Sequence, residues 1–294
     1  EAAPSSSNTV TFERSGEINH VTGEVTWQAW TAKAGDATLE GHPLPLVTGY
    51  LAQSATNNGS EVAPSTTAEA IVATEATGNI TEEVTYVKLG SWIPQPPTGT
   101  VEVPPTVYPN NPDDPTQPGT DVPTIPYIPG YIPVGPDGST PLVPKDPGDP
   151  TKGYEAPPVP GDPTTDTTIP YVKAAQTGSV KFVDTSDNSV KFTETLNGQT
   201  GDEFGYDPAA KIKEFENLGY TVVNRDNYSP TGTFDNIDGN SQDFTYELTP
   251  KVSPITPTDP GKPGQPIDPN NPDGPKWPTD KGVDDVSRTI SRTV

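Results

Sequence analysis

The stretch SVKFVDTSDNSVKFTETL, residues 179–196, decides how the central part of this chain folds. Apolar and polar side chains alternate through residues 179–184 and again through residues 190–196, and Asp187 and Asn188 lie between the two runs. Alternation with a period of two is typical of β-strands that bury one face, and Asp and Asn favour the turn between them. The stretch therefore predicts a β-hairpin.

The period changes at residues 207–219, DPAAKIKEFENLG. Asp207 is a suitable helix N-cap, Pro208 fits the first helical position, and Gly219 is the usual residue after a helix end. Apolar residues repeat on one helical face at Ile212, Phe215 and Leu218. Residues 220–223 and 244–248 read as two further strands. Residues 174–251 are thus predicted to form a small α+β module with the order ββαββ and a long loop before the last strand.

Composition restricts the remainder of the 294 residues. The chain has 39 prolines, 27 glycines, no cysteine and only 30% hydrophobic residues. Too little apolar surface is present to offset the ordering entropy of one large core, so the folded parts must be small modules. The lack of cysteine excludes disulfides and thiol chemistry. No run approaches the ~18 apolar residues of a membrane helix, so no membrane span is predicted in this sequence.

The net charge of −23 at pH 7 excludes classes of partner. Such a chain repels DNA, RNA and anionic lipid headgroups, so we expect no nucleic-acid partner. Sialylated or sulfated glycans are also repelled near neutral pH. Binding to them would depend on short-range contacts, on bridging cations or on partly protonated carboxylates.

The first part of the chain is predicted to be β-rich. Residues 9–14, 25–31 and 80–87 alternate and are rich in threonine and valine, and no helical pattern lies between them. Two proline-rich segments lie outside the predicted modules. Residues 93–170 hold 23 of the prolines, many with a period of three, and the prolines of residues 252–283 keep that period strictly. Three residues per turn is the period of polyproline II, so both segments are predicted to be extended, acidic linkers. An apolar cluster in the first linker is expected to dock on a neighbouring module: Tyr127, Ile128, Tyr131 and Ile132.

Residues 180–184, 196–201, 218–220 and 234–244 resemble the MucBP (mucin-binding protein) module of Gram-positive surface adhesins. Residues 9–16, 21–27 and 47–50 resemble the partner module that alternates with MucBP in Mub-type adhesin repeats of lactobacillus-like bacteria. The resemblance implies a β-grasp (ubiquitin-like) fold for the second module and binding to mucin glycoproteins.

The expected fold class is therefore β-rich α+β, with two small modules joined by extended proline-rich linkers. The expected parts are a partner module lacking its first strand (1–92), an acidic proline-rich linker (93–170), a MucBP-like β-grasp module (171–251), a linker with period-three prolines (252–283) and an orphan strand (284–294). The closing strand resembles the one that opens the first type of module. We therefore expect the chain to be one period of a tandem array, cut out of phase.

The resemblance implies an extracellular repeat on a bacterial cell surface, attached to the wall through other parts of its parent protein. Its expected partners are mucin glycoproteins or glycans of host mucus and neighbouring repeats. Two alternatives stay open. The chain could be a purely structural stalk, or it could bind host proteins such as immunoglobulins through an exposed sheet edge.

Sugar binding needs aromatic faces for stacking and planar polar groups for hydroxyls. The candidate residues are Trp30, Tyr50, Tyr206, Asn227 and Tyr228. We expect Tyr228 to be the best exposed of these because it follows a polar loop. By contrast, Phe12 and Trp27 are expected to be buried.

Two acidic loops offer hard oxygen ligands of the kind that calcium takes, namely Asp184, Asp187, Asp235 and Asp238. Neither loop has EF-hand spacing, and ordinary Asx turns explain the same residues. No other cofactor is predicted. No nucleophile motif surrounds His20 or His42, and the abundant carboxylates follow the general acidity of the chain, so the sequence favours a protein that is not an enzyme.

Overall fold

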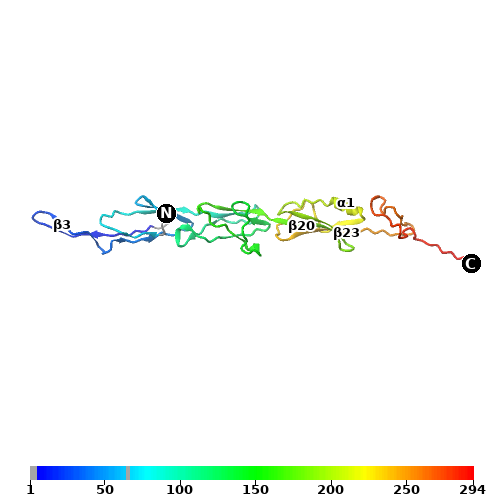
Figure 1. Cartoon of the computed structure of the whole chain (residues 1–294), viewed down its shortest axis with the longest axis horizontal. Helices are drawn as coiled ribbons and strands as arrows, with labels where there is room; N and C mark the ends of the chain where they lie inside the picture. Colours follow the sequence, from blue (N-terminus) through cyan, green and yellow to red (C-terminus); the bar gives the residue numbers. More distant parts are fainter. Residues whose placement is uncertain (1–4, 64–66) are drawn as a thin grey trace. The chain divides into compact units, whose positions relative to one another are not determined.

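The computed structural model describes residues 5–63 and 67–294. The chain divides into two compact units. The first runs to Ile128 and includes Ile132–Val172, and the second comprises Pro129–Tyr131 and Lys173–Val294. Across the described residues the structure is β-rich with a single α-helix, α1 (Ala209–Asn217) (Figure 1). No helix in this part of the chain has the length and apolar character needed to cross a membrane.

The second unit contains a four-stranded sheet made of β20 (Ala175–Asp184), β21 (Val190–Gln199), β22 (Tyr220–Asn224) and β23 (Ser241–Pro250). The strand order is β21-β20-β23-β22. The central strands β20 and β23 run parallel, and both outer strands pair antiparallel with their neighbours. The predicted hairpin and the predicted order ββαββ are confirmed.

Helix α1 begins one residue later than predicted, at Ala209 with Pro208 rather than Asp207 as the N-cap residue, and it ends just before Gly219. The Asp207 carboxylate accepts a hydrogen bond from the Ala209 N–H at 2.9 Å. Gly219 has a φ of +93°, a left-handed conformation that favours glycine and ends the helix. The expectation that Leu218 faces the core is wrong, because the helix stops at Asn217 and the Leu218 side chain is 54% exposed.

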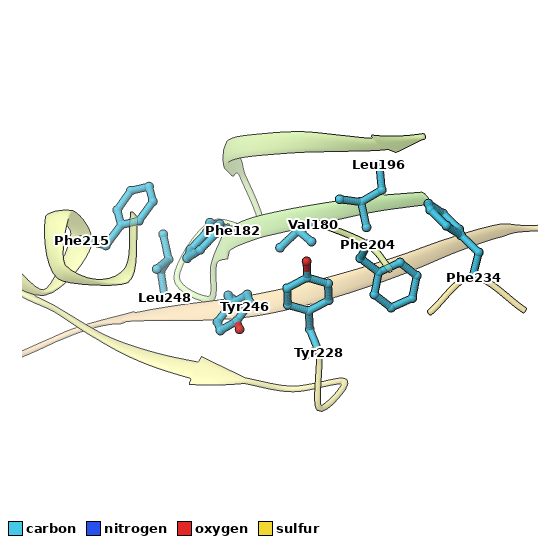
Figure 2. Close-up of a cluster of buried hydrophobic side chains, with 9 residues drawn as sticks. All are labelled: Val180, Phe182, Leu196, Phe204, Phe215, Tyr228, Phe234, Tyr246 and Leu248. Carbon is cyan, nitrogen blue, oxygen red and sulfur yellow. The ribbon is translucent and has the colours of Figure 1, made fainter. Parts of the chain in front are cut away.

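Figure 2 shows the core of this unit, which is rich in aromatic rings. Phe182 on β20 lies at its centre and is completely buried. Its ring stacks on Tyr246 of β23, with centroids 4.8 Å apart, and on Phe215 of α1, with centroids 5.3 Å apart. The helix is therefore held against the sheet by aromatic contacts, which add to the free energy of apolar burial. The buried cluster comprises Val180, Phe182, Leu196, Phe204, Phe215, Tyr228, Phe234, Tyr246 and Leu248.

Residues 129–131 belong to this second unit although they precede it by more than forty residues. The carbonyl of Gly130 accepts hydrogen bonds from the Ala174 N–H and from the Thr200 hydroxyl, both at 2.8 Å. The Gly130 N–H donates to Asp238 at 3.1 Å. This segment of the predicted linker is thus built into the unit.

Replacing Gly130 with alanine should destabilise the second unit. Gly130 has a φ of +77°, and a Cβ there would lie 2.7 Å from the Asn236 Cβ. The combined strain and overpacking should cost about 2 kcal/mol of unfolding free energy. Urea denaturation checks this. Gly161→Ala is the control, because a Cβ at Gly161 has no neighbour within 4 Å. Equal stability of the two variants would show that the Gly130 contacts do not contribute to the stability of the second unit.

The first unit is a set of small sheets. Strands β7 (Tyr50–Asn57), β8 (Ser60–Val62) and β11 (Glu82–Lys88) form a three-stranded sheet of order β11-β7-β8. A four-stranded sheet has the order β13-β12-β19-β17, from β12 (Ser91–Gln95), β13 (Thr106–Val107), β17 (Tyr131–Pro133) and β19 (Thr167–Lys173). The other strands are β1 (Phe12–Glu13), β2 (Gly16–Ile18), β3 (Val25–Trp27), β4 (Thr31–Ala32), β5 (Thr38–Leu39), β6 (His42–Pro43), β9 (Thr67–Ala68), β10 (Ile71–Val72), β14 (Asn110–Asn111), β15 (Asp114–Pro118), β16 (Thr124–Ile125) and β18 (Tyr154–Glu155), and Pro150–Lys152 form a 3-10 turn.

The structure differs from the expectation of an extended linker at residues 93–170. Tyr108, Ile125 and Ile169 from this segment are almost fully buried, and they share one core with Leu51 and Trp92. The physical reason is that these apolar side chains lie between the prolines and collapse on the first module. Prolines then occupy short strands and turns rather than a polyproline helix.

Aspartate side chains close the turns between these short strands. In each of three Asp-Pro-Thr sequences, the aspartate Oδ1 accepts hydrogen bonds from both the N–H and the hydroxyl of the threonine two residues later. The three turns are at Asp114, Asp149 and Asp162. Such Asx turns supply the hydrogen bonds that proline, which has no N–H, cannot make.

Residues 252–283 also differ from the expected rod. Backbone hydrogen bonds from Gly264 to Trp277 and from Ile267 to Pro275, both at 2.9 Å, fold this tail back on itself. Gly261 likewise donates to Val283 at 2.8 Å. The residues between the period-three prolines, among them Gly261, Gly264 and Ile267, provide the N–H donors for this ladder. Residues 284–294 carry no strand in the structure, unlike the strand expected there.

Both proline-rich segments contain the sequence Asn-Asn-Pro-Asp, at residues 110–113 and 270–273, and one asparagine of each binds backbone groups at or just before a Gly-Tyr pair. Asn110 accepts from the Gly49 N–H at 2.8 Å and donates to the carbonyls of Val47 and Tyr50 at 3.2 and 2.7 Å. Asn271 donates to the Asn217 carbonyl at 2.7 Å, two residues before Gly219. Each segment is therefore fastened to the unit that contains it.

Asn110→Ala should destabilise the first unit more than Asn271→Ala destabilises the second. Asn110 makes three hydrogen bonds in a partly buried position, and its loss leaves the Gly49 N–H without its partner, at a cost of about 2 kcal/mol. Asn271 makes one bond at the surface. Asn270→Ala, which removes no side-chain hydrogen bond, is the control. Chemical denaturation of the three variants measures the order, and a reversed order would contradict this role of Asn110.

Candidate functional site

The most exposed aromatic side chains lie on a two-stranded ribbon formed by residues 12–32. Strand β1 pairs with β4, placing Phe12 opposite Ala32, and β2 pairs with β3, placing Gly16 opposite Trp27. The turn at its tip is closed by Asn19, whose side chain accepts from the Val21 N–H at 2.8 Å. The strand residues are largely exposed on both faces, which is unusual because an isolated two-stranded ribbon has little to stabilise it.

Two tryptophans on this ribbon contact the same arginine. Trp27 is 53% exposed and Trp30 is 42% exposed. The guanidinium carbon of Arg14 lies 4.2 Å from the Trp27 ring centroid and 4.6 Å from that of Trp30. Both distances are within the range of cation–π attraction, so Arg14 joins the two rings and stabilises their orientation.

Trp30 is exposed, and its role in ligand binding stays a prediction, but the expectation that Trp27 is buried is wrong. Alternation along a strand tells which residues share a face, and only a second layer of structure can bury that face. No described residue forms such a layer over β2 and β3, whose residues are all exposed. Phe12, also expected to be buried, is half-buried at the base of the ribbon.

The ribbon has the chemistry of a surface that stacks on sugars. Exposed indole rings pack against the C–H faces of pyranose rings, and a guanidinium donates hydrogen bonds to hydroxyl or anionic oxygens. No ion pair joins Arg14 to a carboxylate within residues 5–63 and 67–294. Its guanidinium donates no hydrogen bond to any described residue either, so its N–H groups can donate to a ligand.

Tyr50, the other aromatic candidate of the first unit, is 37% exposed. It opens β7, in a different sheet from the ribbon, next to the turn that Asn110 clamps. The structure therefore does not bring Tyr50 and Trp30 into one sheet.

The candidates of the second unit do not form an exposed surface. Tyr228 is only 4% exposed, so the expectation that it is the best exposed aromatic residue is wrong. Asn224 closes the loop by accepting from the Tyr228 N–H and donating to its carbonyl, both at 2.9 Å, and Asn227 has a φ of +55°. The loop thus turns the Tyr228 ring into the core (Figure 2).

The Tyr228 hydroxyl donates to the Tyr206 carbonyl at 2.7 Å, which satisfies its polar atom inside the core. Burial raises the pKa of Tyr228 to about 12. Tyr206 is half-buried against the same cluster, and Asn227 remains exposed in its loop. Asn224, four residues before Tyr228, was the sequence signal for this closed loop.

The two acidic loops lie at opposite ends of β20. Asp184 and Asp187 flank the turn after the strand, while Asp238 contacts Gln176 at its beginning, with a distance of 3.4 Å between the side chains. Ten residues of strand place these ends about 30 Å apart, so the loops cannot share one ion. Asp235 accepts from the Ile237 N–H at 2.9 Å in an Asx turn.

Among the described residues, no three or more carboxylate, imidazole or thiol groups gather in a way that could hold a metal ion. The Asp184 oxygens already accept from Ser186 and Tyr220, and Lys191 lies 3.4 Å away. Calcium binding by either loop stays a prediction.

Asp184 should make the stability of the second unit depend on pH. Hydrogen bonds from Ser186, helped by Tyr220 and Lys191, lower the pKa of Asp184 to about 2. An unfolded aspartate has a pKa of about 3.9. The stabilisation is thus fully present above about pH 4 and is lost as the pH falls through about 2.

Asp184→Asn tests this directly. The difference in unfolding free energy between the unmodified chain and the variant should be largest at pH 5 and should shrink toward pH 2, as measured by urea denaturation. Asp273→Asn, at an exposed tail position, should show no such trend. A difference that stays constant over this range would contradict the role of the Asp184 charge.

Comparisons with known proteins identify two segments of the chain. Residues 176–249 match the family described as mucin binding domain, and residues 1–90 match the family described as Muc B2-like domain. Residues 91–175 lie between the matches and belong to neither. No curated protein matches the chain.

Two solved structures are similar to part of the chain. One is a type 2 repeat of the mucus binding protein MUB from Lactobacillus reuteri, with 29% identity, a TM-score of 0.26 and coverage of 28% of this chain and 45% of that one. The other is the crystal structure of Mub-RV, with 26% identity, a TM-score of 0.26 and coverage of 29% and 44%. The matched region spans less than half of each solved chain.

Proposed function

The chain is a repeat of the Mub type, a Muc B2-like domain followed by a mucin binding domain, and we propose that it binds mucin glycoproteins outside the cell as part of a bacterial surface adhesin. The observation that carries this proposal is the presence of both family matches in one chain, at residues 1–90 and 176–249. Neither family is one of enzymes, which supports a binding role rather than catalysis.

The second unit supports the β-grasp fold that we propose for the mucin binding domain. Its two central strands, β20 and β23, are the first and last of the sheet and run parallel, with a hairpin partner on each outer side. A single helix packs on the sheet through Phe215. A four-stranded mixed sheet with one helix packed against it is the arrangement expected of a β-grasp fold.

We place the glycan contact on the ribbon of the first unit. Trp27 and Trp30 are exposed there and Arg14 orients both rings, whereas Tyr228 of the second unit is buried. Preoriented aromatic side chains bind with a lower entropy cost than mobile ones. The ribbon therefore provides a ready stacking surface.

Binding to mucin-coated surfaces tests the proposal. The unmodified chain should bind, and the double variant Trp27→Ala/Trp30→Ala should bind about tenfold more weakly, since two stacking contacts are lost. Trp277→Ala removes a tryptophan from the tail and is the matched control, expected to bind like the unmodified chain. Equal binding by the double variant would place the contact elsewhere.

Pretreatment of the mucin with periodate distinguishes glycan binding from protein binding. Loss of binding after oxidation of the sugars supports glycan recognition. Binding that survives oxidation would indicate a protein ligand, and immunoglobulin would then be the partner to assay. A chain that binds neither mucin nor immunoglobulin would be a structural stalk.

A further inference from the structure

The first unit contains a hollow of about 600 Å³ that neither family match accounts for. Its walls come from β7 and β11, which lie within residues 1–90, and from β15 and residues 160–164, which lie outside both matches. The volume lies within the range of about 300–1,000 Å³ that is typical of small-ligand sites. The folded proline-rich segment therefore supplies two walls of the hollow that residues 1–90 do not provide.

The walls of this hollow are held in place before any ligand arrives. The Gly90 N–H donates to the Pro163 carbonyl at 2.9 Å, and the Tyr108 hydroxyl donates to the Thr165 carbonyl at 3.0 Å, which fastens the wall of residues 160–164. On β15, Thr116 is fixed by its two hydrogen bonds to Asp114. A site whose walls are already ordered binds with little cost in conformational entropy.

The lining combines an apolar floor with a few polar groups. Leu51, Val87 and the rings of three prolines supply the apolar surface. Gln53 and Gln117 are exposed, and neither carboxamide has a hydrogen-bond partner among the described residues. Asp162 accepts both hydrogen bonds of its Asp-Pro-Thr turn through Oδ1, so Oδ2 is free to accept from a ligand.

We propose that this hollow binds a neutral saccharide. The two carboxamides, which both donate and accept, suit vicinal hydroxyl groups, and the Asp162 oxygen accepts from a further hydroxyl. Apolar C–H groups of the sugar ring rest on Leu51 and on the proline rings. The proposal rests on the proposed function, because it names one class of mucin sugar and a second place to hold it.

Charge decides between neutral and acidic sugars at this site. None of the described residues that line the hollow is cationic, and Asp162 contributes a negative charge. A carboxylate or sulfate on the ligand would meet this charge without a counterion at short range. The ribbon differs in this respect, because Arg14 supplies a cation there.

Amide chemical shifts of the isotope-labelled full chain test the proposal with four separate probes. These are N-acetylglucosamine, galactose, fucose and N-acetylneuraminic acid. At least one of the three neutral sugars should shift the amide signals of residues 51–53, 116, 117, 161, 162 and 164 in a saturable way, since the prolines at 118, 160 and 163 have no amide N–H. N-acetylneuraminic acid should leave these signals unchanged.

Two kinds of variant then locate the site. Gln53→Ala and Gln117→Ala should each weaken binding of the neutral sugar about fivefold, the loss typical of one neutral hydrogen bond. Gln95→Ala, at an exposed glutamine at the end of β12, is the control. Gly161→Leu should abolish binding, since Gly161 lines the hollow and a larger side chain there obstructs it, while its Cβ meets no atom within 4 Å and causes no clash. Gly78→Leu, equally open, is its control.

The proposal is overturned if no neutral sugar shifts these signals, if only N-acetylneuraminic acid does, or if Gly161→Leu binds the sugar as well as Gly78→Leu does. Adhesion to mucin is measured separately. Mucin binding without a sugar response in the hollow would contradict this inference but not the proposed function. A sugar response without adhesion to mucin would contradict the proposed function but not the presence of a sugar site in the hollow.

Discussion

Hydrogen bonds from aspartate and asparagine side chains to the backbone are the interaction on which the proline-rich parts of this protein depend. Each proline removes an N–H donor, so long ladders of backbone hydrogen bonds cannot form there. The Asp-Pro-Thr turns and the Asn110 hydrogen bonds supply the missing partners locally. The turns at Asp114 and Asp162 also lie in two walls of the hollow, so the same hydrogen bonds that fold this segment also shape the hollow.

The fold of the second unit was largely predictable from sequence, and that of the segment between the modules was not. In residues 174–251, changes in the period of the apolar residues mark the strands and the helix, and residues such as Asp207 and Gly219 mark the helix ends. A proline at every third residue fits polyproline II and also fits short strands joined by turns. What decides between them is long-range packing, such as the hydrogen bond from the Trp92 indole to the Pro157 carbonyl at 2.8 Å. No local pattern encodes that contact.

The candidate surface was predictable only in part, for a related reason. The sequence predicts one strand through Trp27 and Trp30, whereas the structure ends β3 at Trp27 and leaves Trp30 before β4, and the pattern does not indicate whether another layer covers them. Tyr228 shows the opposite case, because a polar loop that looked exposed is closed by Asn224 and turns its ring inward. The hollow combines four segments that are separate along the chain, and only the folded structure brings Gln53 and Gln117 to one place.

The parallel pairing of β20 with β23 has a mechanical consequence. These are the first and last strands of the sheet, and their hydrogen-bonded register runs from Thr177 opposite Ser241 to Asp184 opposite Leu248. Tension applied to the chain at either side of this sheet pulls the two strands along their length in opposite directions. The bonds between them are then loaded together in shear, and no single pair can open ahead of the others. A sheet with this strand order therefore resists stretching by flow better than a sheet whose end strands separate one hydrogen bond at a time.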